Sequence, residues 1–321
     1  MASVTIIIPT YNRARALETV WPCYFTHPDV EKVIVVNDGS TDGTKQLLGK
    51  LSLIAPRPVE IIDHPRKLGQ QASRISGISA VTTEWILFGE DDVWLGPDYV
   101  TTLLKQAQGL NAAIIAGRLV SVRVDETFMV SQLSDTGQAL TGGLFDLRAF
   151  SAQFDAKFDA PIKAPFLHTI ALINRKVFQQ ATFDTRFKGT ALREETDFYL
   201  SAARAGFKIF LTPQAVCYHL RGPLSMSGGQ RGDRLSFLKT EFWCYLNTWA
   251  LLRKQWPFLV QKHGFSGIPV LWMFGVFLPE RLRHYKSVVR EPSSNGFLPG
   301  SWIDLLNIRK LRRRLKKYFG N

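Results

Sequence analysis

Three adjacent carboxylates follow a short apolar run in the N-terminal half of the chain. The run covers residues 84–88, and Glu90, Asp91 and Asp92 come almost directly after it. Such a run is consistent with a buried strand, and ligands of open parallel sheets bind beyond the carboxyl ends of the strands. Because Mg²⁺ and Mn²⁺ prefer hard oxygen ligands, the triplet predicts a divalent cation held against a diphosphate. The alternative is a solvated acidic turn.

The elements around this triplet predict the sheet that positions it. Strands are expected over residues 4–12, 32–38, 59–63 and 84–88, helices over 13–24 and 70–80, a helix capped by Ser40 or Thr41, and a strand pair over 120–124 and 127–130. The alternation of strands and helices with short connections predicts an α/β fold, with a mostly parallel sheet flanked by helices. Thr10, Asp38 and the acidic triplet would then collect along one edge of the sheet.

A second acidic block could supply acid-base chemistry. Glu194 and Glu195 precede residues 196–204, a segment with helical apolar spacing that stops at Gly206. At a helix N-terminus the backbone dipole favours the ionised form of a carboxyl group. An ionised carboxylate there can deprotonate a hydroxyl as a general base. The alternative is that these acids only stabilise the end of the helix.

Four ordered blocks resemble glycosyltransferase family 2, whose nucleotide-diphospho-sugar-binding domain is called the GT-A fold. The blocks are residues 8–13 (Ile-Pro-Thr-Tyr-Asn-Arg), 36–44 (Val-Asn-Asp-Gly-Ser-Thr-Asp-Gly-Thr), 89–93 (Gly-Glu-Asp-Asp-Val) and 192–198 (Leu-Arg-Glu-Glu-Thr-Asp-Phe), followed by Tyr218-His219. The resemblance covers roughly residues 3 to 220 and implies a GT-A-type sheet with a nucleotide-sugar donor.

The resemblance also implies which residues bind the donor. They are Pro9, Thr10, Tyr11, Arg13, Asp38, Arg74, Glu90 and Asp91. In this family pattern Asp38 accepts a hydrogen bond from the base edge, and Arg74 lies near the nucleotide. The neighbour of that arginine is usually Asn in the family but is Ile75 here. Glu90 or Asp91 would act through the ribose or through water.

Metal ligands and a base follow from the same blocks. Asp92 is expected to be the direct ligand of Mn²⁺ or Mg²⁺, and the resemblance makes His219 a further ligand. Imidazole suits Mn²⁺ better than Mg²⁺, although a histidine on an apolar strand can equally be a core residue. Glu195 aligns with the family's base, where Asp is usual, and Glu194 stays an alternative. The cation would neutralise the departing nucleoside diphosphate.

These features favour a metal-dependent, inverting glycosyltransferase. It would move a sugar from a nucleotide-diphosphate donor to a hydroxyl of a saccharide or lipid-linked saccharide. One alternative keeps the fold but uses polyprenyl phosphate as the acceptor. Another is a non-catalytic protein that binds nucleotide or nucleic acid through its basic tail, but the chain has no recognised nucleic-acid-binding module. No Gly-rich phosphate loop follows the first strand, which argues against a kinase or a dehydrogenase.

The chain divides, by its composition, into two regions. Residues 1–230 would form the glycosyltransferase domain, with a nucleotide-binding half (1–110) and an acceptor half (111–230), and residues 231–321 a helical, basic appendage. A helix is expected over 237–256, ended by Pro257, and the apolar run 264–278 is shorter than the roughly twenty residues that span a bilayer. The run is expected to be interfacial or packed.

The last 41 residues carry nine of the thirteen net positive charges. Apolar residues recur among them at intervals of three or four between Leu305 and Tyr318, which is typical of a helix lying on an anionic membrane surface. The alternative is a solvated, disordered tail. Cys23, Cys217 and Cys244 are too few and too widely spaced for a disulfide framework or a zinc site. With a strand beginning almost at the N-terminus, the sequence predicts a cytoplasmic protein at the inner face of the membrane.

Overall fold

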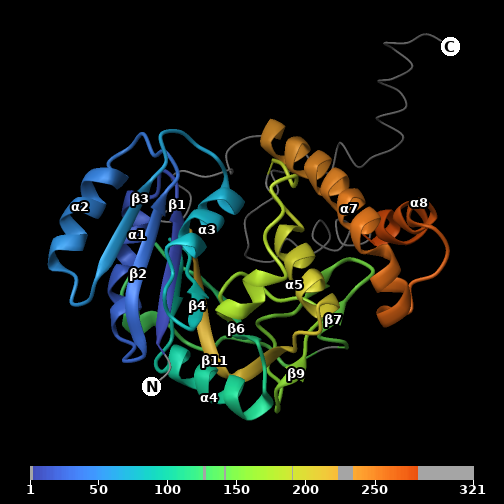
Figure 1. Ribbon diagram of the computed structural model, residues 1–321, viewed down its shortest axis with the longest axis horizontal. Coiled ribbons are helices and arrows are strands. Elements are labelled where there is room, and N and C mark those ends of the chain that lie inside the picture. Colours follow the sequence, from blue (N-terminus) through green and yellow to red (C-terminus); the bar gives the residue numbers. More distant parts are fainter. Residues whose placement is uncertain (1–2, 126–127, 141, 190, 223–233, 281–321) are drawn as a thin grey trace, which may run out of the picture. The chain divides into compact units, whose positions relative to one another are not determined.

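Nine strands form one sheet in the part of the chain that the structure describes (Figure 1). The computed structural model describes residues 3–125, 128–140, 142–189, 191–222 and 234–280, and for 234–238 the backbone alone. The sheet order is β3-β2-β1-β4-β10-β6-β11-β5, and β9 pairs with β11. Two compact units divide the chain: Met1–Asp146 with Phe150–Phe265, and Leu147–Ala149 with Ser266–Asn321.

The strands of the large sheet are β1 (Val4–Thr10), β2 (Val30–Asn37), β3 (Val59–Asp63), β4 (Trp85–Phe88), β5 (Val93–Leu95), β6 (Ile114–Arg123), β9 (Ile162–Lys163), β10 (Ala171–Asn174) and β11 (Ile209–Arg221). Two further strands, β7 (Phe145–Asp146) and β8 (Ser151–Ala152), pair with each other. The α-helices are α1 (Ala14–Val20), α2 (Thr44–Ile54), α3 (Gln70–Ser79), α4 (Tyr99–Leu110), α5 (Glu194–Arg204), α7 (Arg234–His263) and α8 (Pro269–Trp272). Shorter turns cover Trp21–Phe25, Val130–Gln132, Arg175–Gln179 and, as a π-helix, Met273–Phe277.

The predicted mostly parallel α/β sheet is confirmed. Strands β3, β2, β1 and β4 run parallel to one another, and β11 runs parallel to β6. The exceptions are β10, β5 and β9, which pair antiparallel with their neighbours. Helix α3 packs on β1 and β2, and α4 packs on β6, β10 and β11. The strands covered in this way are almost continuously apolar, as buried parallel strands require.

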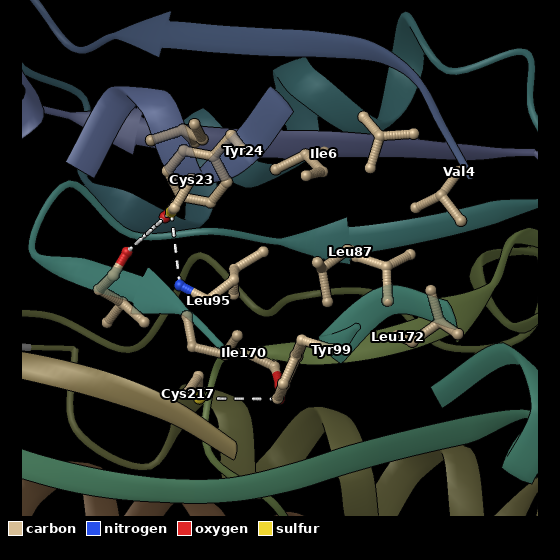
Figure 2. Close-up of a cluster of buried hydrophobic side chains, with 14 of the residues drawn as sticks. Val4, Ile6, Cys23, Tyr24, Leu87, Leu95, Tyr99, Ile170, Leu172 and Cys217 are labelled. Carbon is tan, nitrogen blue, oxygen red and sulfur yellow. Dashed lines mark hydrogen bonds between the residues drawn. The ribbon is translucent and has the colours of Figure 1, made fainter. Parts of the chain in front are cut away.

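The core of the first unit joins the two halves of the sheet (Figure 2). Apolar side chains from β1, β4 and β10 fill it, and two thiols are embedded at its margin. The Leu95 amide donates to Cys23 Sγ (3.4 Å), and Cys217 Sγ donates to the Tyr99 hydroxyl (3.7 Å). Cys23, Cys217 and Cys244 are all buried and free, as expected. Burial raises the pKa of the Cys23 thiol to about 12.

Helix α2 begins later than the sequence indicates. Ser40 and Thr41 were expected to cap it, but it starts at Thr44 after an N-cap glycine. Ser40 Oγ instead accepts from the Asn12 amide (2.9 Å), and the Thr41 amide donates to Asn12 Oδ1 (2.7 Å). The two residues therefore tie the loop after β2 to the loop after β1.

Two other predicted elements are wrong in extent. The helix expected over 13–24 stops at Val20, because Pro22 has no N–H to continue the helical ladder, and a 3₁₀ turn follows. The strand pair expected over 120–124 and 127–130 is not found among the described residues. Its first half belongs to β6, which pairs with β10 and β11 instead.

Helix α7 continues through Pro257, where the sequence predicts its end. Leu251 and Leu259 are fully buried on either side of the proline, so packing sustains both halves of the helix. In the second unit, the run 264–278 forms α8 and the π-helical turn. Across the described ranges, no helix is both long and apolar enough to cross a membrane. The predicted basic helix within 281–321 lies outside the described residues.

Candidate active site

The carboxyl ends of β1, β2 and β4 meet at one edge of the sheet. The Asp38 amide, just beyond β2, donates to the Thr10 carbonyl at the end of β1 (2.9 Å). Thr10 Oγ1 donates to Asp91 Oδ2 (2.8 Å), just beyond β4. The structure thus brings together the three strand ends that the sequence analysis assigned to the donor.

The second half of the sheet supplies a histidine to the acidic triplet. Strand β5 pairs with β11 so that His219 faces Val93, one residue after the triplet. His219 Nε2 lies 3.5 Å from Asp92 Oδ2. Arg13 Nη1 lies 2.9 Å from the same oxygen and 3.8 Å from Asp91 Oδ1. Asp92 is therefore contacted both by His219, the other predicted metal ligand, and by Arg13, a predicted donor-binding residue.

A buried tyrosine fixes the turn that carries the triplet. The Tyr24 hydroxyl donates to the Glu90 carbonyl (2.6 Å) and accepts from the Glu90 amide (3.1 Å). A Cβ at Gly89 would lie only 2.9 Å from the Tyr24 ring, so glycine permits this approach. Sequence reasoning missed Tyr24, which gives no local signal beyond being an aromatic residue in an apolar segment.

A single arginine links the triplet to the second acidic block. Arg74 is completely buried; its Nη1 lies 2.5 Å from Glu194 Oε1 and its Nη2 3.0 Å from Glu195 Oε1. Nη2 also lies 4.0 Å from Glu90 Oε1. The contacts in the structure place Arg74 among carboxylates, and its expected contact with the nucleotide stays a prediction.

The two glutamates at the start of α5 have different surroundings. The Glu194 side chain is 3% exposed, whereas the Glu195 side chain is 33% exposed. Thr169 Oγ1 donates to Glu195 Oε1 (2.5 Å), the oxygen that Arg74 also contacts. Both bonds fall on Oε1, and no hydrogen bond to Oε2 is found among the described residues. Thr169 was missed because it is 26 residues away and belongs to no recognisable motif.

Burial and mutual repulsion raise the pKa of several carboxyl groups in this cluster. Burial, reinforced by the Asp92 charge, raises the pKa of both Glu90 and Asp91 to about 7. Burial also raises the pKa of Glu194 to about 8, although Arg74 acts against it. At Asp92 burial acts to raise the pKa, but the hydrogen bond and charge of His219, with Arg13, outweigh it and lower the pKa.

The remaining predicted donor residues line the β1 and β2 ends. Both Asp38 oxygens accept hydrogen bonds, Oδ1 from the Leu68 amide (2.8 Å) and Oδ2 from the Gly69 amide (2.8 Å). His64 Nδ1 also lies 2.9 Å from Asp38 Oδ1. Asp38 therefore orders the loop before α3, and its contact with a nucleobase stays a prediction.

An aromatic face lies next to this loop. Lys67 Nζ sits over the Tyr11 ring, 4.0 Å from its centroid, which is a cation-π contact that sequence reasoning missed. Pro9 lies within β1 opposite Val36. Tyr11 and Pro9 are both partly exposed at the strand end, which is compatible with the predicted contact to a nucleoside.

The donor set around Asp92 suits a cation that takes few protein ligands. In the described part of the chain, no three His, Cys, Asp or Glu side chains converge closely enough to enclose a metal ion. Mg²⁺ and similar ions at phosphate sites commonly use one or two carboxylates, with water and phosphate completing the shell. A carboxylate with an imidazole 3.5 Å away fits that pattern and favours Mn²⁺.

Comparison with known proteins identifies the class to which this fold and site belong. A family model described as glycosyl transferase family 2 matches residues 5–181, more than half of the chain. The chain therefore belongs to glycosyl transferase family 2. The predicted family resemblance is confirmed.

Particular relatives match a part of the chain. Glycosyltransferase GlyA of Streptococcus pneumoniae is 30% identical over 125 residues, 38% of this chain and 18% of the relative. The pre-mycofactocin glycosyltransferase of Mycobacterium tuberculosis is 31% identical over 121 residues, 37% of this chain and 24% of the relative. The matches thus span less than a quarter of either relative.

Solved structures share the fold at low sequence identity. S. aureus TarS 1–349 in complex with UDP-GlcNAc superposes with a TM-score of 0.53 at 13% identity, over 78% of this chain and 65% of that one. GalNAc-T7 with UDP, GalNAc and Mn²⁺ gives a TM-score of 0.56 at 12% identity, over 69% of this chain and 44% of that one. These likenesses support the GT-A-type fold.

The raised pKa values predict how stability depends on pH without metal. A carboxyl whose pKa rises on folding binds its proton more tightly in the folded state, so the free energy of unfolding falls as pH rises through that pKa. The fall begins above the ordinary pKa of a carboxyl group and is complete once the pH passes the raised pKa values, so urea titrations should show its upper part from pH 6.5 to 8.5, caused by Glu90, Asp91 and Glu194. Burial lowers the pKa of His27 and His168. Their contribution therefore raises the free energy of unfolding as pH rises, but mainly below this range.

The double substitution Glu90→Gln/Asp91→Asn should reduce this fall, because the amides cannot titrate. Glu31→Gln, at an exposed position in β2, should leave the pH profile unchanged. A double variant whose profile matches that of the wild type would show that the triplet does not hold protons in this range.

Proposed function

We propose that this protein is a metal-dependent, inverting glycosyltransferase that moves a sugar from a nucleotide-diphosphate donor to a hydroxyl acceptor. The observation that carries the proposal is the position of Arg74. Its guanidinium lies 4.0 Å from Glu90 on the donor side and 3.0 Å from Glu195 on the base side. Arg74 thus links one member of the acidic triplet to the proposed base.

In the proposed reaction, Glu195 Oε2 takes the proton of the acceptor hydroxyl. The acceptor oxygen forms its bond to the anomeric carbon as the bond from that carbon to the diphosphate breaks. Arg74 and Thr169 hold Glu195 through hydrogen bonds to Oε1. Glu194, almost fully buried, anchors Arg74 and does not face the substrate. One displacement of this kind inverts the anomeric configuration.

The leaving group carries two phosphates whose charge grows as the bond breaks. Asp92 and His219 are the residues that would hold Mn²⁺ or Mg²⁺, which, when bound, neutralises that charge. Arg13, 2.9 Å from Asp92, adds a fixed positive charge on the same side. Glu90 and Asp91 would act through the ribose or through water.

Two alternatives are less well supported by the site. A polyprenyl phosphate acceptor is already ionised and needs no base, whereas the site offers a partly exposed carboxylate, Glu195, that can serve as one. A saccharide or lipid-linked saccharide hydroxyl therefore fits better. A nucleic-acid-binding role is disfavoured because the described end of the sheet carries a cluster of carboxylates, which repels phosphate backbones.

A donor screen tests the proposal as a whole. The screen starts with UDP-GlcNAc and UDP-GalNAc, since related structures were solved with UDP-GlcNAc and with UDP, GalNAc and Mn²⁺. A donor that raises the melting temperature with Mn²⁺ and releases UDP faster with an acceptor present would support transfer. Failure of every nucleotide sugar to bind with either metal would contradict it.

The first prediction separates the base from its neighbour. Glu195→Gln keeps the size of the side chain but cannot take a proton, so kcat should fall roughly a hundredfold or more, the usual contribution of general-base catalysis. Donor affinity, measured by calorimetry, should barely change. Glu194→Gln is the control for charge, and its main effect should be on stability because Glu194 is buried against Arg74. A larger kcat loss in Glu194→Gln would reverse the assignment.

The second prediction assigns the metal. Asp92→Asn keeps the shape but removes a charged ligand, so Mn²⁺ affinity and Mn²⁺-dependent donor binding should fall together. Mn²⁺ binding is read directly by electron paramagnetic resonance, without turnover. Asp135→Asn, whose carboxylate pairs with Arg118 elsewhere, is a matched control that should bind Mn²⁺ normally. Wild-type Mn²⁺ affinity in Asp92→Asn would disprove the ligand assignment.

We also propose that the region 231–321 holds the protein on an anionic membrane surface. Its last 41 residues contain eleven Lys or Arg and two acids. In the second unit, Ile268, Leu271 and Phe274 are 54%, 67% and 65% exposed. Apolar side chains that precede a basic segment in the sequence are typical of interfacial attachment. Anionic lipid at the inner face of the cell membrane fits this charge.

The third prediction tests attachment by truncation. Each Lys or Arg near an anionic surface contributes on the order of 1 kcal/mol, and residues 309–317 contain seven. A chain ending at Pro299 should stay folded and bind nucleotide, but bind vesicles of equal phosphatidylcholine and phosphatidylglycerol much more weakly. Its residual binding should also lose salt dependence. Vesicles of pure phosphatidylcholine are the control, and undiminished binding to the anionic vesicles would refute the role of the tail.

A further inference from the structure

Helix α7 holds the first turn of helix α5 from the side opposite Glu195. Residues two apart in an α-helix are rotated by about 200° around its axis, so Asp197 lies across the turn from Glu195. The Asp197 side chain is fully buried and accepts from Lys254 Nζ (2.6 Å) and Gln255 Nε2 (2.7 Å). Both donors belong to α7. One side of this turn therefore carries Glu195, and the opposite side is bonded to α7.

Lys254 balances two carboxylates at this contact. Its Nζ also lies 3.1 Å from Asp184 Oδ2, in the segment that leads to α5. Arg186 Nη2, which is largely exposed, lies 2.7 Å from the same Asp184 oxygen. Asp197 has no comparable second cation among the contacts described for it. Removing Lys254 would leave a buried carboxylate with Gln255 alone, and an uncompensated buried charge is strongly unfavourable.

Two further polar side chains of α7 contact the segment that leads to α5. Asn247 donates to the Lys188 carbonyl (2.9 Å) and accepts from the Lys188 amide (3.2 Å). Arg193 Nε donates to Thr248 Oγ1 (3.3 Å). Asn247, Thr248 and Gln255 are at most 3% exposed. Buried polar groups need hydrogen-bond partners. A shift of α7 along the segment would break these bonds, whereas apolar packing would tolerate small shifts.

Helix α5 has little local support of its own at this end. Its N-cap, Arg193, is in the left-handed region (φ 80°) and gives no side-chain cap. The first turn carries three carboxyl groups close together, those of Glu194, Glu195 and Asp197, which the helix dipole favours. A capping side chain would normally fix such an end. Here the fixing contacts come from Arg74 on one side and from α7 on the other.

We propose that Lys254 is a positioning residue for Glu195, acting through Asp197 and the rigid first turn of α5. The proposal rests on the proposed function of Glu195 as the base. Neither α5 nor α7 lies within residues 5–181, the range that the family model matches.

The kinetic test compares three variants. Lys254→Met should lower kcat roughly tenfold or more, since misplacement of a catalytic group by about 1 Å can cost that much. The KM for the donor and the affinity for UDP with Mn²⁺ should change less than twofold or so. Lys254→Arg keeps the charge and should restore most of kcat. Lys262→Met, at an exposed position of the same helix, should match the wild type.

A second readout does not depend on turnover. In Lys254→Met, hydrogen exchange at the Thr196 and Asp197 amides should speed up, while the strands of the sheet keep wild-type protection. If the variant does not fold, Lys254→Gln, which keeps a hydrogen-bond donor without the charge, replaces it in both arms. Unchanged exchange, or wild-type kcat with a folded protein, would overturn the positioning role. Faster exchange in a protein whose wild type transfers no sugar would instead support α7 as the support of α5 and refute the proposed function.

Discussion

The arrangement of the site depends on one buried cation. Arg74 extends from α3 and is completely buried, yet it contacts Glu194, Glu195 and, at 4.0 Å, Glu90. Burial acts to lower its pKa, but these carboxylates outweigh burial and raise it. Removing one partner from a buried ion pair commonly costs about 3–5 kcal/mol, because the other charge is left uncompensated. Arg74 therefore links the acids that follow β4 to those that begin α5, and loss of either partner would leave a buried charge without compensation.

This constraint also divides the carboxylates by role. Glu194 is enclosed against Arg74, whereas the Glu195 side chain is partly exposed. Asp92 is paired with Arg13 and His219 at the other end of the cluster. In the proposed function the same group of acids supplies an anchor, a base and a metal ligand, because each acid has different neighbours.

Local pattern was enough to predict much of the sheet and the strand ends. Apolar runs and the turn residues after them identify β1, β2, β3 and β4, and parallel pairing then places their carboxyl ends together. The acids at the start of α5 were also predictable, because Gly206 marks the end of that helix. Each of these features is encoded within a few neighbouring residues.

Contacts made across the fold could not be predicted in this way. The hydroxyls of Tyr24 and Thr169 act on carboxylates or backbone 66 and 26 residues away, and no local pattern marks them. The same holds for Lys254, which reaches Asp197 from a helix that the sequence suggested was an appendage. The most direct test of the account is a double-mutant cycle on Arg74 and Glu194, measured as free energy of unfolding. We predict that Arg74→Met is strongly destabilising and that adding Glu194→Gln recovers part of the loss. Strictly additive losses would contradict the claim that this buried ion pair holds the site together.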